Sequence, residues 1–346
     1  MAALRVIVTG AGSIVGQGVV KALRHSALPI HVIATDIAPL SAALFRADEA
    51  LLMTPVEAPN ALDSIIGTMR VLKADALMIG SEFDLAFFSQ HRSAIEQETG
   101  TKVIVSPPAT VELADDKLST AKFLEAHKLP FAPAIAVVNV EEAARWAGVK
   151  GYPLVLKARR GTSARNVHVV QDESELRRLL PTVLNPMLQQ LAGPIEATLA
   201  HEYTCSIFRC ADDRVLGPFV SRRTLRGGSS WIVEVAPEAA IEPLMKQLGA
   251  LVPSVGSLNV QLMLTNGRAV PFEFNARFSG TTPIRAYYGF NEPEMALRSY
   301  VLGEPVPDPI IRRGLAVRYI EEIFLDDVNA AMIGPNFPKG RVQTWF

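Results

Sequence analysis

Short apolar runs alternate with helical patterns over residues 4–108. The runs lie at residues 5–8, 31–35, 76–79 and 102–105. This alternation is typical of βαβ units and predicts a parallel sheet. Pro107 and Pro108 then interrupt the pattern, and we expect a domain boundary there.

A smaller and less regular set of elements follows the two prolines. We expect a helix at residues 118–127 and strands at 134–138, 154–157 and 167–170. From Asp172 to Leu191 the apolar positions have the spacing of one helix with a single buried stripe, and Asp172 with Glu175 forms its N-terminal signature. Pro181 and Pro186 should kink or divide this helix.

Beyond Gly193 the apolar segments are strand-like. They lie at residues 195–199, 203–208, 215–219, 232–235, 259–264 and 269–274. Their short spacing predicts an antiparallel set that closes a larger lobe. The chain therefore combines an α/β part with an α+β part.

Composition narrows the class of protein. Of 346 residues, 49% are hydrophobic and 20% charged, which allows a large core shared among two or three compact units. Lys plus Arg number 34 against 35 Asp plus Glu, so the charge favours neither a nucleic-acid nor a membrane partner. Cys205 and Cys210 lack metal-ligand or disulfide-framework spacing, and no stretch reaches membrane-spanning length. We expect a cytoplasmic protein.

The N-terminal glycines suggest a dinucleotide site. Gly10, Gly12 and Gly16 lie between a strand and a helix, and Asp36 ends the next strand, where such proteins hold a ribose. This pattern would fit an NAD(P)-dependent oxidoreductase. Position 15 is valine, however, so the strict glycine fingerprint is absent. The alternative is that the glycines serve only the tight turn from strand to helix.

The most informative segment is residues 271–281, PFEFNARFSGT. In an extended strand Glu273, Asn275 and Arg277 project to one side, while three phenylalanines and an alanine project to the core. A carboxylate and an amide oxygen suit a hard divalent cation, and a guanidinium next along can hold phosphate oxygens. The segment predicts a magnesium–phosphate site, with a solvated edge strand as the alternative.

A hairpin joins this strand to Gln261. Asn266 and Gly267 are a strong turn signal. A two-residue turn would place Gln261 on the face opposite Glu273, whereas a three-residue loop ending at Gly267 places both on one face. We expect the three-residue loop, and with it Gln261 as a third metal-site residue.

Basic residues would supply the charge for phosphate binding. Lys117 opens a helical segment, and Lys157 ends an apolar run. Gly161, Thr162 and Ser163 follow within a basic, small-residue turn that can fold over a polyphosphate. A solvated basic hairpin is the alternative interpretation of that turn.

The order of these motifs resembles the ATP-grasp superfamily, most closely the branch with the carbamoyl phosphate synthase large chain and the ATP-grasp amino-acid ligases. Lys117, the Lys157 strand with its basic loop, Gln261 and the Glu273-x-Asn275-x-Arg277 strand carry the resemblance. It implies a Rossmann-like domain at 1–108 that binds no dinucleotide, a small ATP-grasp lobe at 109–192 and a large lobe at 193–346.

The resemblance also implies site roles. Lys117 and Lys157 would contact ATP phosphates, with Arg277 and Lys157 in the catalytic step, and Glu202 would take the ribose. We interpret Gln189 and Gln190 as the end of the preceding helix. The adenine hinge is therefore expected in the segment that contains Glu196, Ala197 and Leu199.

The implied activity is that of an ATP- and Mg²⁺-dependent carboxylate–amine ligase, with Mn²⁺ as a possible substitute. It would act on an amino acid or small carboxylic acid through an acyl phosphate. Gly280, Thr281, Arg222, Arg226 and Arg285 are the expected substrate contacts. Alternatives are a carbamoyl-phosphate-synthase-like enzyme acting on bicarbonate or a carboxylate, and the oxidoreductase. A homodimer is a family-level expectation.

Overall fold

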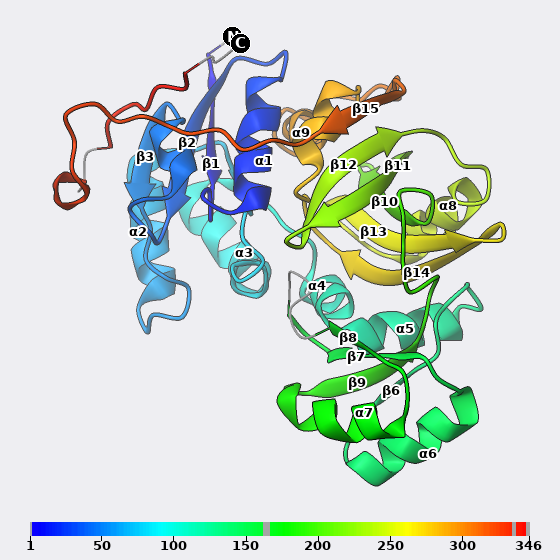
Figure 1. The fold of residues 1–346 in the computed structure, drawn as a ribbon. Helices are drawn as coiled ribbons and strands as arrows, with labels where there is room; N and C mark the ends of the chain where they lie inside the picture. The colour runs from blue at the N-terminus through cyan, green and yellow to red at the C-terminus, as the bar shows by residue number, and fades with distance from the viewer. Residues whose placement is uncertain (1, 162–166, 334–336, 344–346) are drawn as a thin grey trace.

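The computed structural model describes residues 2–161, 167–333 and 337–343. Three sheets organise these residues into three units, and the smallest unit extends away from the other two (Figure 1). Among the described helices, none has the length and apolar character needed to cross a membrane.

The N-terminal unit is a parallel five-stranded sheet in the order β3-β2-β1-β4-β5, as the alternating pattern predicted. Its strands are β1 (Leu4–Val8), β2 (Ile30–Asp36), β3 (Glu49–Leu52), β4 (Ala76–Met78) and β5 (Lys102–Ile104). Its helices are α1 (Ile14–Arg24), the 3-10 turn η1 (Ala42–Phe45), α2 (Ala61–Leu72) and α3 (Leu85–Thr99). The prediction missed only β3 of these strands, which has four residues, none of them fully buried.

The N-terminal glycines build the turn between β1 and α1. A Cβ on Gly16 would lie 2.3 Å from the Gly10 carbonyl oxygen, so α1 packs against the turn only with glycine there. The Asp36 carboxylate accepts hydrogen bonds from the Gly12 and Ala38 N–H groups at 2.7 and 3.0 Å. These contacts within the protein support the turn interpretation over dinucleotide binding.

The small unit is a four-stranded antiparallel sheet in the order β6-β9-β7-β8. Its elements are β6 (Ala134–Ala136), α6 (Val140–Lys150), β7 (Leu154–Ala158), β8 (Val167–Val170), α7 (Glu173–Leu179), the 3-10 turn η2 (Leu180–Thr182) and β9 (Pro186–Gln190). The long helix expected from Asp172 is wrong. Asp172 does cap α7, but the helix ends before Pro181, and the chain then reverses into β9, a buried central strand.

The large unit is an antiparallel six-stranded sheet in the order β14-β13-β10-β11-β12-β15. Its strands are β10 (Glu202–Arg209), β11 (Val215–Arg226), β12 (Ser229–Val235), β13 (Gly256–Thr265), β14 (Arg268–Asn275) and β15 (Gly314–Val317). The strand expected at 195–199 is absent, because this segment follows Pro194 as an irregular and mostly exposed connection.

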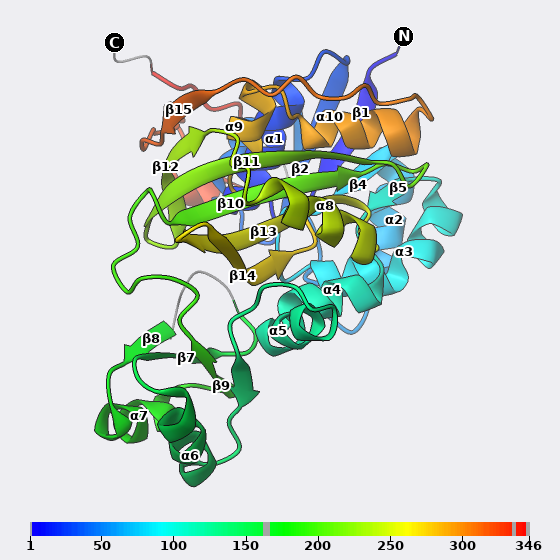
Figure 2. The ribbon, with the colours of Figure 1, turned by 90° about the vertical axis from the view of Figure 1, so that its right-hand side faces the viewer.

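Helices cover this sheet, as Figure 2 shows. They are α4 (Pro108–Asp115), α5 (Lys117–Ala126), α8 (Glu242–Leu251), α9 (Thr282–Tyr287), α10 (Glu292–Ala296) and the π-helical turn η3 (Leu297–Val301). The 3-10 turn η4 (Ala330–Met332) belongs to the C-terminal segment, which runs beside the N-terminal unit in Figure 1. Although α4 and α5 fall in the segment expected to form the small lobe, both pack against β14 of the large sheet. The domain limits inferred from sequence stay a prediction.

The β13–β14 hairpin places Gln261 and Glu273 on one face, as predicted, but with a different turn. The turn has two residues, Asn266 and Gly267, both with positive φ, so the expected three-residue loop is wrong. A β-bulge at Phe272 then shifts the register by one residue, and Gln261 pairs directly with Glu273 on one face. Phe272 borders a cavity instead of entering the core.

Two helical glycines give a matched stability test. Gly16→Ala should lower the free energy of unfolding by about 1–3 kcal/mol, because its Cβ strikes the Gly10 carbonyl. Gly67→Ala, in the exposed middle of α2 with no atom within 4 Å of the new Cβ, should raise it by about 0.5–1 kcal/mol. Urea unfolding monitored by tryptophan fluorescence measures both, and equal effects would contradict the packing argument.

Candidate active site

A cavity of about 530 Å³ lies where the three units meet. The N-terminal unit contributes the loops after β1 and β4, the small unit contributes β7 and the end of β9, and the large unit contributes the face formed by β10, β13 and β14. The sites inferred from distant parts of the sequence therefore converge on one cavity.

The large sheet presents a polar face to this cavity. Glu202, Gln261 and Glu273 come from three neighbouring strands, and Glu273 lies directly opposite Gln261. Asn275 is buried beside Glu273, with its amide nitrogen 3.4 Å from the Glu273 carboxylate, and it does not itself border the cavity. Arg223 donates to Glu202 at 2.7 Å and to Gln261 at 2.7 Å, which fixes both side chains.

Two lysines face this polar surface. Burial lowers the pKa of Lys157 on β7 from its ordinary value of 10.5 to about 8, opposed by the nearby Glu273 carboxylate and reinforced by Lys117. Lys117 is the first residue of α5, fixed there because Asp116 caps the helix, and its ammonium donates to the Gly161 carbonyl at 2.7 Å. Both lysines and Gly161 border the cavity. Thr162 and Ser163 lie outside the described residues.

The connection between the small and large units passes along the cavity at residues 189–194. Gln189 and Gln190 end strand β9, and the backbone that follows borders the cavity. Glu196, Ala197 and Leu199 do not border it, and Glu196 and Ala197 are exposed. The segment expected to form the adenine hinge therefore lies outside the cavity lining. That expectation assumed that residues 189–190 continue a helix, whereas they end strand β9.

The opposite end of the cavity carries a second group of polar residues. Gly280 and Thr281 line it, as expected, within a turn that leads into α9. Arg277 donates to the Phe278 carbonyl at 2.9 Å and forms an ion pair with Glu82, which follows β4. Arg318 donates to the Gly280 carbonyl at 2.5 Å, and burial lowers the pKa of its guanidinium.

Three arginines expected to bind substrate lie elsewhere. Arg222 projects from the opposite face of β11, 3.7 Å from the Glu234 carboxylate. Arg226 is exposed at the end of β11 and stacks on Trp231 at 4.7 Å. Arg285 is fully buried below the cavity floor. Successive side chains of a strand point to opposite faces, so Arg222 points away from the cavity and Arg223 points into it.

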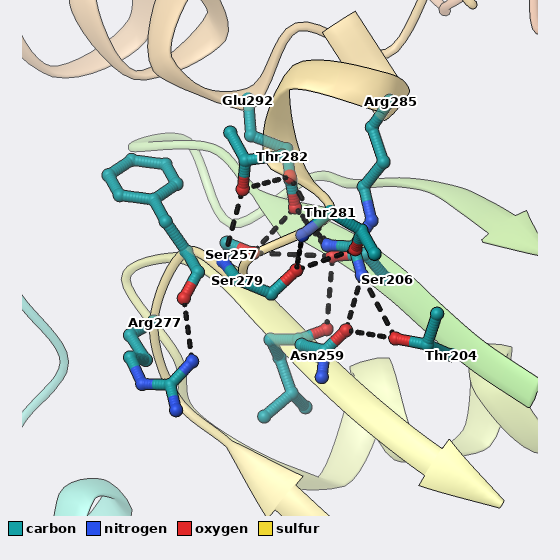
Figure 3. A network of polar contacts seen from close by, with 12 residues as sticks. Thr204, Ser206, Ser257, Asn259, Arg277, Ser279, Thr281, Thr282, Arg285 and Glu292 are labelled. Atoms are coloured by element: carbon teal, nitrogen blue, oxygen red, sulfur yellow. Dashed lines mark hydrogen bonds and ion pairs between the residues drawn. The ribbon is translucent and has the colours of Figure 1, made fainter. Parts of the chain in front are cut away.

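Arg285 belongs to a buried polar network shown in Figure 3. It forms an ion pair with Glu292 at 3.2 Å, and neither side chain is exposed. Glu292 also accepts hydrogen bonds from Ser206 and Ser257 at 2.5 Å each. Arg285 donates to Asn259, which borders the cavity, so the network supports the cavity floor from beneath.

Sequence reasoning did not name Glu82, Arg223, Arg318 or the backbone of residues 190–193, all of which border the cavity. Only one local signal pointed to any of them: the Gln189-Gln190 pair before Gly193, which would have drawn attention to this segment if residues 186–190 had been interpreted as a strand. Glu82 and Arg318 lie in other parts of the chain from the large sheet's polar face and reach the cavity only through tertiary packing.

The polar face has a donor set that suits Mg²⁺. This ion usually takes one or two carboxylates and completes its shell with water and substrate phosphates. Glu273 and Gln261 supply a carboxylate and an amide oxygen beside two lysines. Within the described ranges, no group of three or more His, Cys, Asp or Glu residues is placed to hold a metal.

Known proteins are similar in sequence to parts of this chain. Residues 6–104 match the family model described as PylC-like, N-terminal domain. The carbamoyl phosphate synthase large chain of Pseudomonas putida is 26% identical over 244 residues, covering 65% of this chain and 22% of that protein. The Thermomicrobium roseum large chain is 24% identical over 317 residues, covering 81% and 28%. This chain thus spans about a quarter of the length of these relatives.

Solved structures of other proteins have a similar fold. N5-carboxyaminoimidazole synthetase of Staphylococcus aureus, complexed with ADP, has a TM-score of 0.73 at 14% identity, covering 92% of this chain and 82% of that one. The biotin carboxylase domain dimer of Hydrogenobacter thermophilus 2-oxoglutarate carboxylase, with MgADP and bicarbonate, has a TM-score of 0.68 at 19% identity, covering 91% and 74%. The chain has the ATP-grasp fold, and the resemblance seen in the sequence is confirmed.

The Arg285–Glu292 pair gives a stability prediction. Glu292→Gln should lower the free energy of unfolding by about 3–5 kcal/mol, because it leaves a fully buried guanidinium without a countercharge. Glu304→Gln, which removes a partly exposed partner of Arg298, should cost less than about 1 kcal/mol. Urea unfolding at neutral pH compares them, and a small effect at Glu292 would contradict the argument.

Lys157 gives a prediction for pH. Its pKa of about 8 lies below the ordinary 10.5, so between these values the unfolded chain binds more protons and stability rises with pH. Lys157→Met should therefore be more stable than the parent at pH 7, by on the order of 2–3 kcal/mol. The difference should shrink as pH rises through 8 toward 10.5. Urea unfolding across this range tests it, with exposed Lys122→Met as the control.

Proposed function

We propose that this chain is an ADP-forming carboxylate–amine ligase that acts through an acyl phosphate. The observation that carries the proposal is the polar face of Gln261 and Glu273, held by Arg223, with Lys157 facing it in one cavity. A carboxylate, amide oxygens and lysines placed together suit a magnesium-bound polyphosphate. The ATP-grasp fold and the nucleotides bound to its structural neighbours support this assignment.

The nucleotide would occupy the half of the cavity between the small and large units. Lys117, Lys157 and Gly161 would hold the phosphates, and the backbone of residues 190–193 would meet the adenine. The Glu202 carboxylate would accept hydrogen bonds from the ribose hydroxyls. Glu273 and Gln261, with Asn275 behind them, would hold Mg²⁺, and the ion would offset the negative charge of the phosphates.

The acid would bind in the other half, where Ser279–Thr281 lie between Arg277 and Arg318. A carboxylate does not react with an amine at neutral pH because its oxygen is a poor leaving group. A carboxylate oxygen attacks the γ-phosphorus of ATP, and ADP is released. The product is an acyl phosphate, from which phosphate can leave. Arg277 would stabilise the resulting acyl phosphate, and the amine would then attack its carbonyl carbon and release inorganic phosphate.

A second candidate is phosphorylation of bicarbonate. The sequence relatives include carbamoyl phosphate synthase large chains, and one structural neighbour was solved with bicarbonate. Arg277 and the 279–281 turn suit this small anion as they suit a carboxylic acid. Bicarbonate is too small to need contacts beyond these. The two candidate functions therefore differ in which acid the enzyme phosphorylates, and an assay of turnover distinguishes them.

The test is phosphate release with ATP and Mg²⁺ over a panel of amino acids, small carboxylic acids and bicarbonate, each with and without an amine. We expect release that needs both acid and amine. Glu273→Gln should lower it at least about 100-fold, and Glu125→Gln, an exposed carboxylate on α5, should leave it unchanged.

Two other results would change the assignment. Release with bicarbonate in place of a carboxylic acid would favour the second candidate. No release with any acid, together with binding of NAD(P) and not of ATP in titration calorimetry, would contradict the ligase proposal and favour the oxidoreductase.

A further inference from the structure

Three carboxylates border the cavity among the residues that the structure describes: Glu82, Glu202 and Glu273. Glu202 accepts two hydrogen bonds from Arg223, at 3.0 and 2.7 Å. Glu273 lies opposite Gln261, within the proposed metal site. The same described lining contains no histidine, aspartate, tyrosine or cysteine. Glu82 is therefore the remaining acidic side chain that faces the reactants.

Glu82 lies at the acid end of the cavity. It follows β4, at the carboxyl edge of the parallel sheet, and thus belongs to a different unit from the metal-site strand. Its carboxylate pairs with Arg277, and the two side chains are 25% and 12% exposed, so the pair is largely shielded but still open to the cavity. A group on Arg277 would therefore lie next to Glu82.

The proposed second step needs a group in this position. An aliphatic amine, with a pKa of about 10 as in lysine, is an ammonium ion at neutral pH and has no lone pair for attack. A neighbouring carboxylate attracts the cation and can accept its proton before the new bond forms. Lys157 is less suited, because it lies near Glu273 and Lys117 on the phosphate side and carries positive charge itself.

We propose that Glu82 binds the amine substrate and accepts its proton, an inference that rests on the ligase function proposed above. The nitrogen attacks the acyl phosphate carbonyl carbon, the C–N bond forms, and the C–O bond to phosphate breaks. Inorganic phosphate leaves with the electron pair of that bond. One ammonium proton passes to the Glu82 carboxylate and then to solvent before the nitrogen attacks. The second proton leaves the nitrogen with the departing phosphate, which is released as hydrogen phosphate. When Arg277 takes up the phosphate oxygens, Glu82 exchanges its guanidinium partner for the incoming ammonium.

Hydroxylamine separates the two steps of the reaction. It is largely unprotonated at neutral pH, so it attacks an acyl phosphate without a base and yields a hydroxamate that ferric chloride detects. The acid panel is therefore assayed twice, once with hydroxylamine and once with ammonium chloride or an amino acid as the acceptor. Parent protein, Glu82→Gln and Glu82→Asp are compared, with Glu98→Gln, an exposed ion-pair variant of the same unit, as the control.

Glu82→Gln should keep hydroxamate formation within about threefold of the parent and lower amide formation at least about 100-fold. Its remaining amide rate should rise about tenfold per pH unit below the pKa of the amine, as free amine replaces ammonium. Glu82→Asp, with a shorter carboxylate, should lie between. Glu98→Gln should match the parent in both assays.

The outcomes separate the two proposals. No hydroxamate from the parent with any acid would overturn the ligase function itself. Hydroxamate from the parent, with Glu82→Gln lowering both products equally, would make Glu82 only a support for Arg277 and would overturn its role toward the amine. Unchanged amide formation would overturn it as well. If Glu82→Gln does not fold, the same comparison with Glu82→Asp decides.

Discussion

The buried Arg285–Glu292 ion pair is the constraint on which the candidate site depends. It joins helices α9 and α10 to strands β10 and β13, because Ser206 and Ser257 bond to Glu292 and Asn259 bonds to Arg285. Removing two charges from water is costly unless their hydrogen-bonding groups are largely paired, so this arrangement tolerates few alternatives. It thereby fixes the turn at residues 279–281 against the floor of the cavity.

The cavity is a shared product of all three units. Lys157 comes from the small sheet, Glu273 and Gln261 from the large sheet, and Glu82 from the parallel sheet. Charges of opposite sign meet across the boundaries between units, as in the Glu82–Arg277 pair. The electrostatics of the site therefore depend on how the units are placed, and binding of a polyphosphate or an acid would change the balance between them.

The β-bulge at Phe272 shows how a correct residue assignment can follow from an incorrect local geometry. The expected loop length was wrong, and with the two-residue turn an unbroken register would have turned Gln261 away from Glu273. The extra residue in β14 restores the facing and brings Phe272 to the cavity. A bulge changes side-chain direction without a strong sequence signal, so only the paired strands reveal it.

The sequence by itself determined the parallel N-terminal sheet, the antiparallel large sheet and the polar strand of Glu273, because strand periodicity and turn residues are local properties. The order of its motifs resembles the ATP-grasp superfamily, and this resemblance brought Lys117 and Lys157 into the same interpretation as that strand. Tertiary structure alone decided that Arg223 and not Arg222 faces the cavity, that β9 replaces a helix, and that Glu82 and Arg318 join the site. These outcomes depend on contacts between residues far apart in the chain, and such contacts leave no periodic pattern in the sequence.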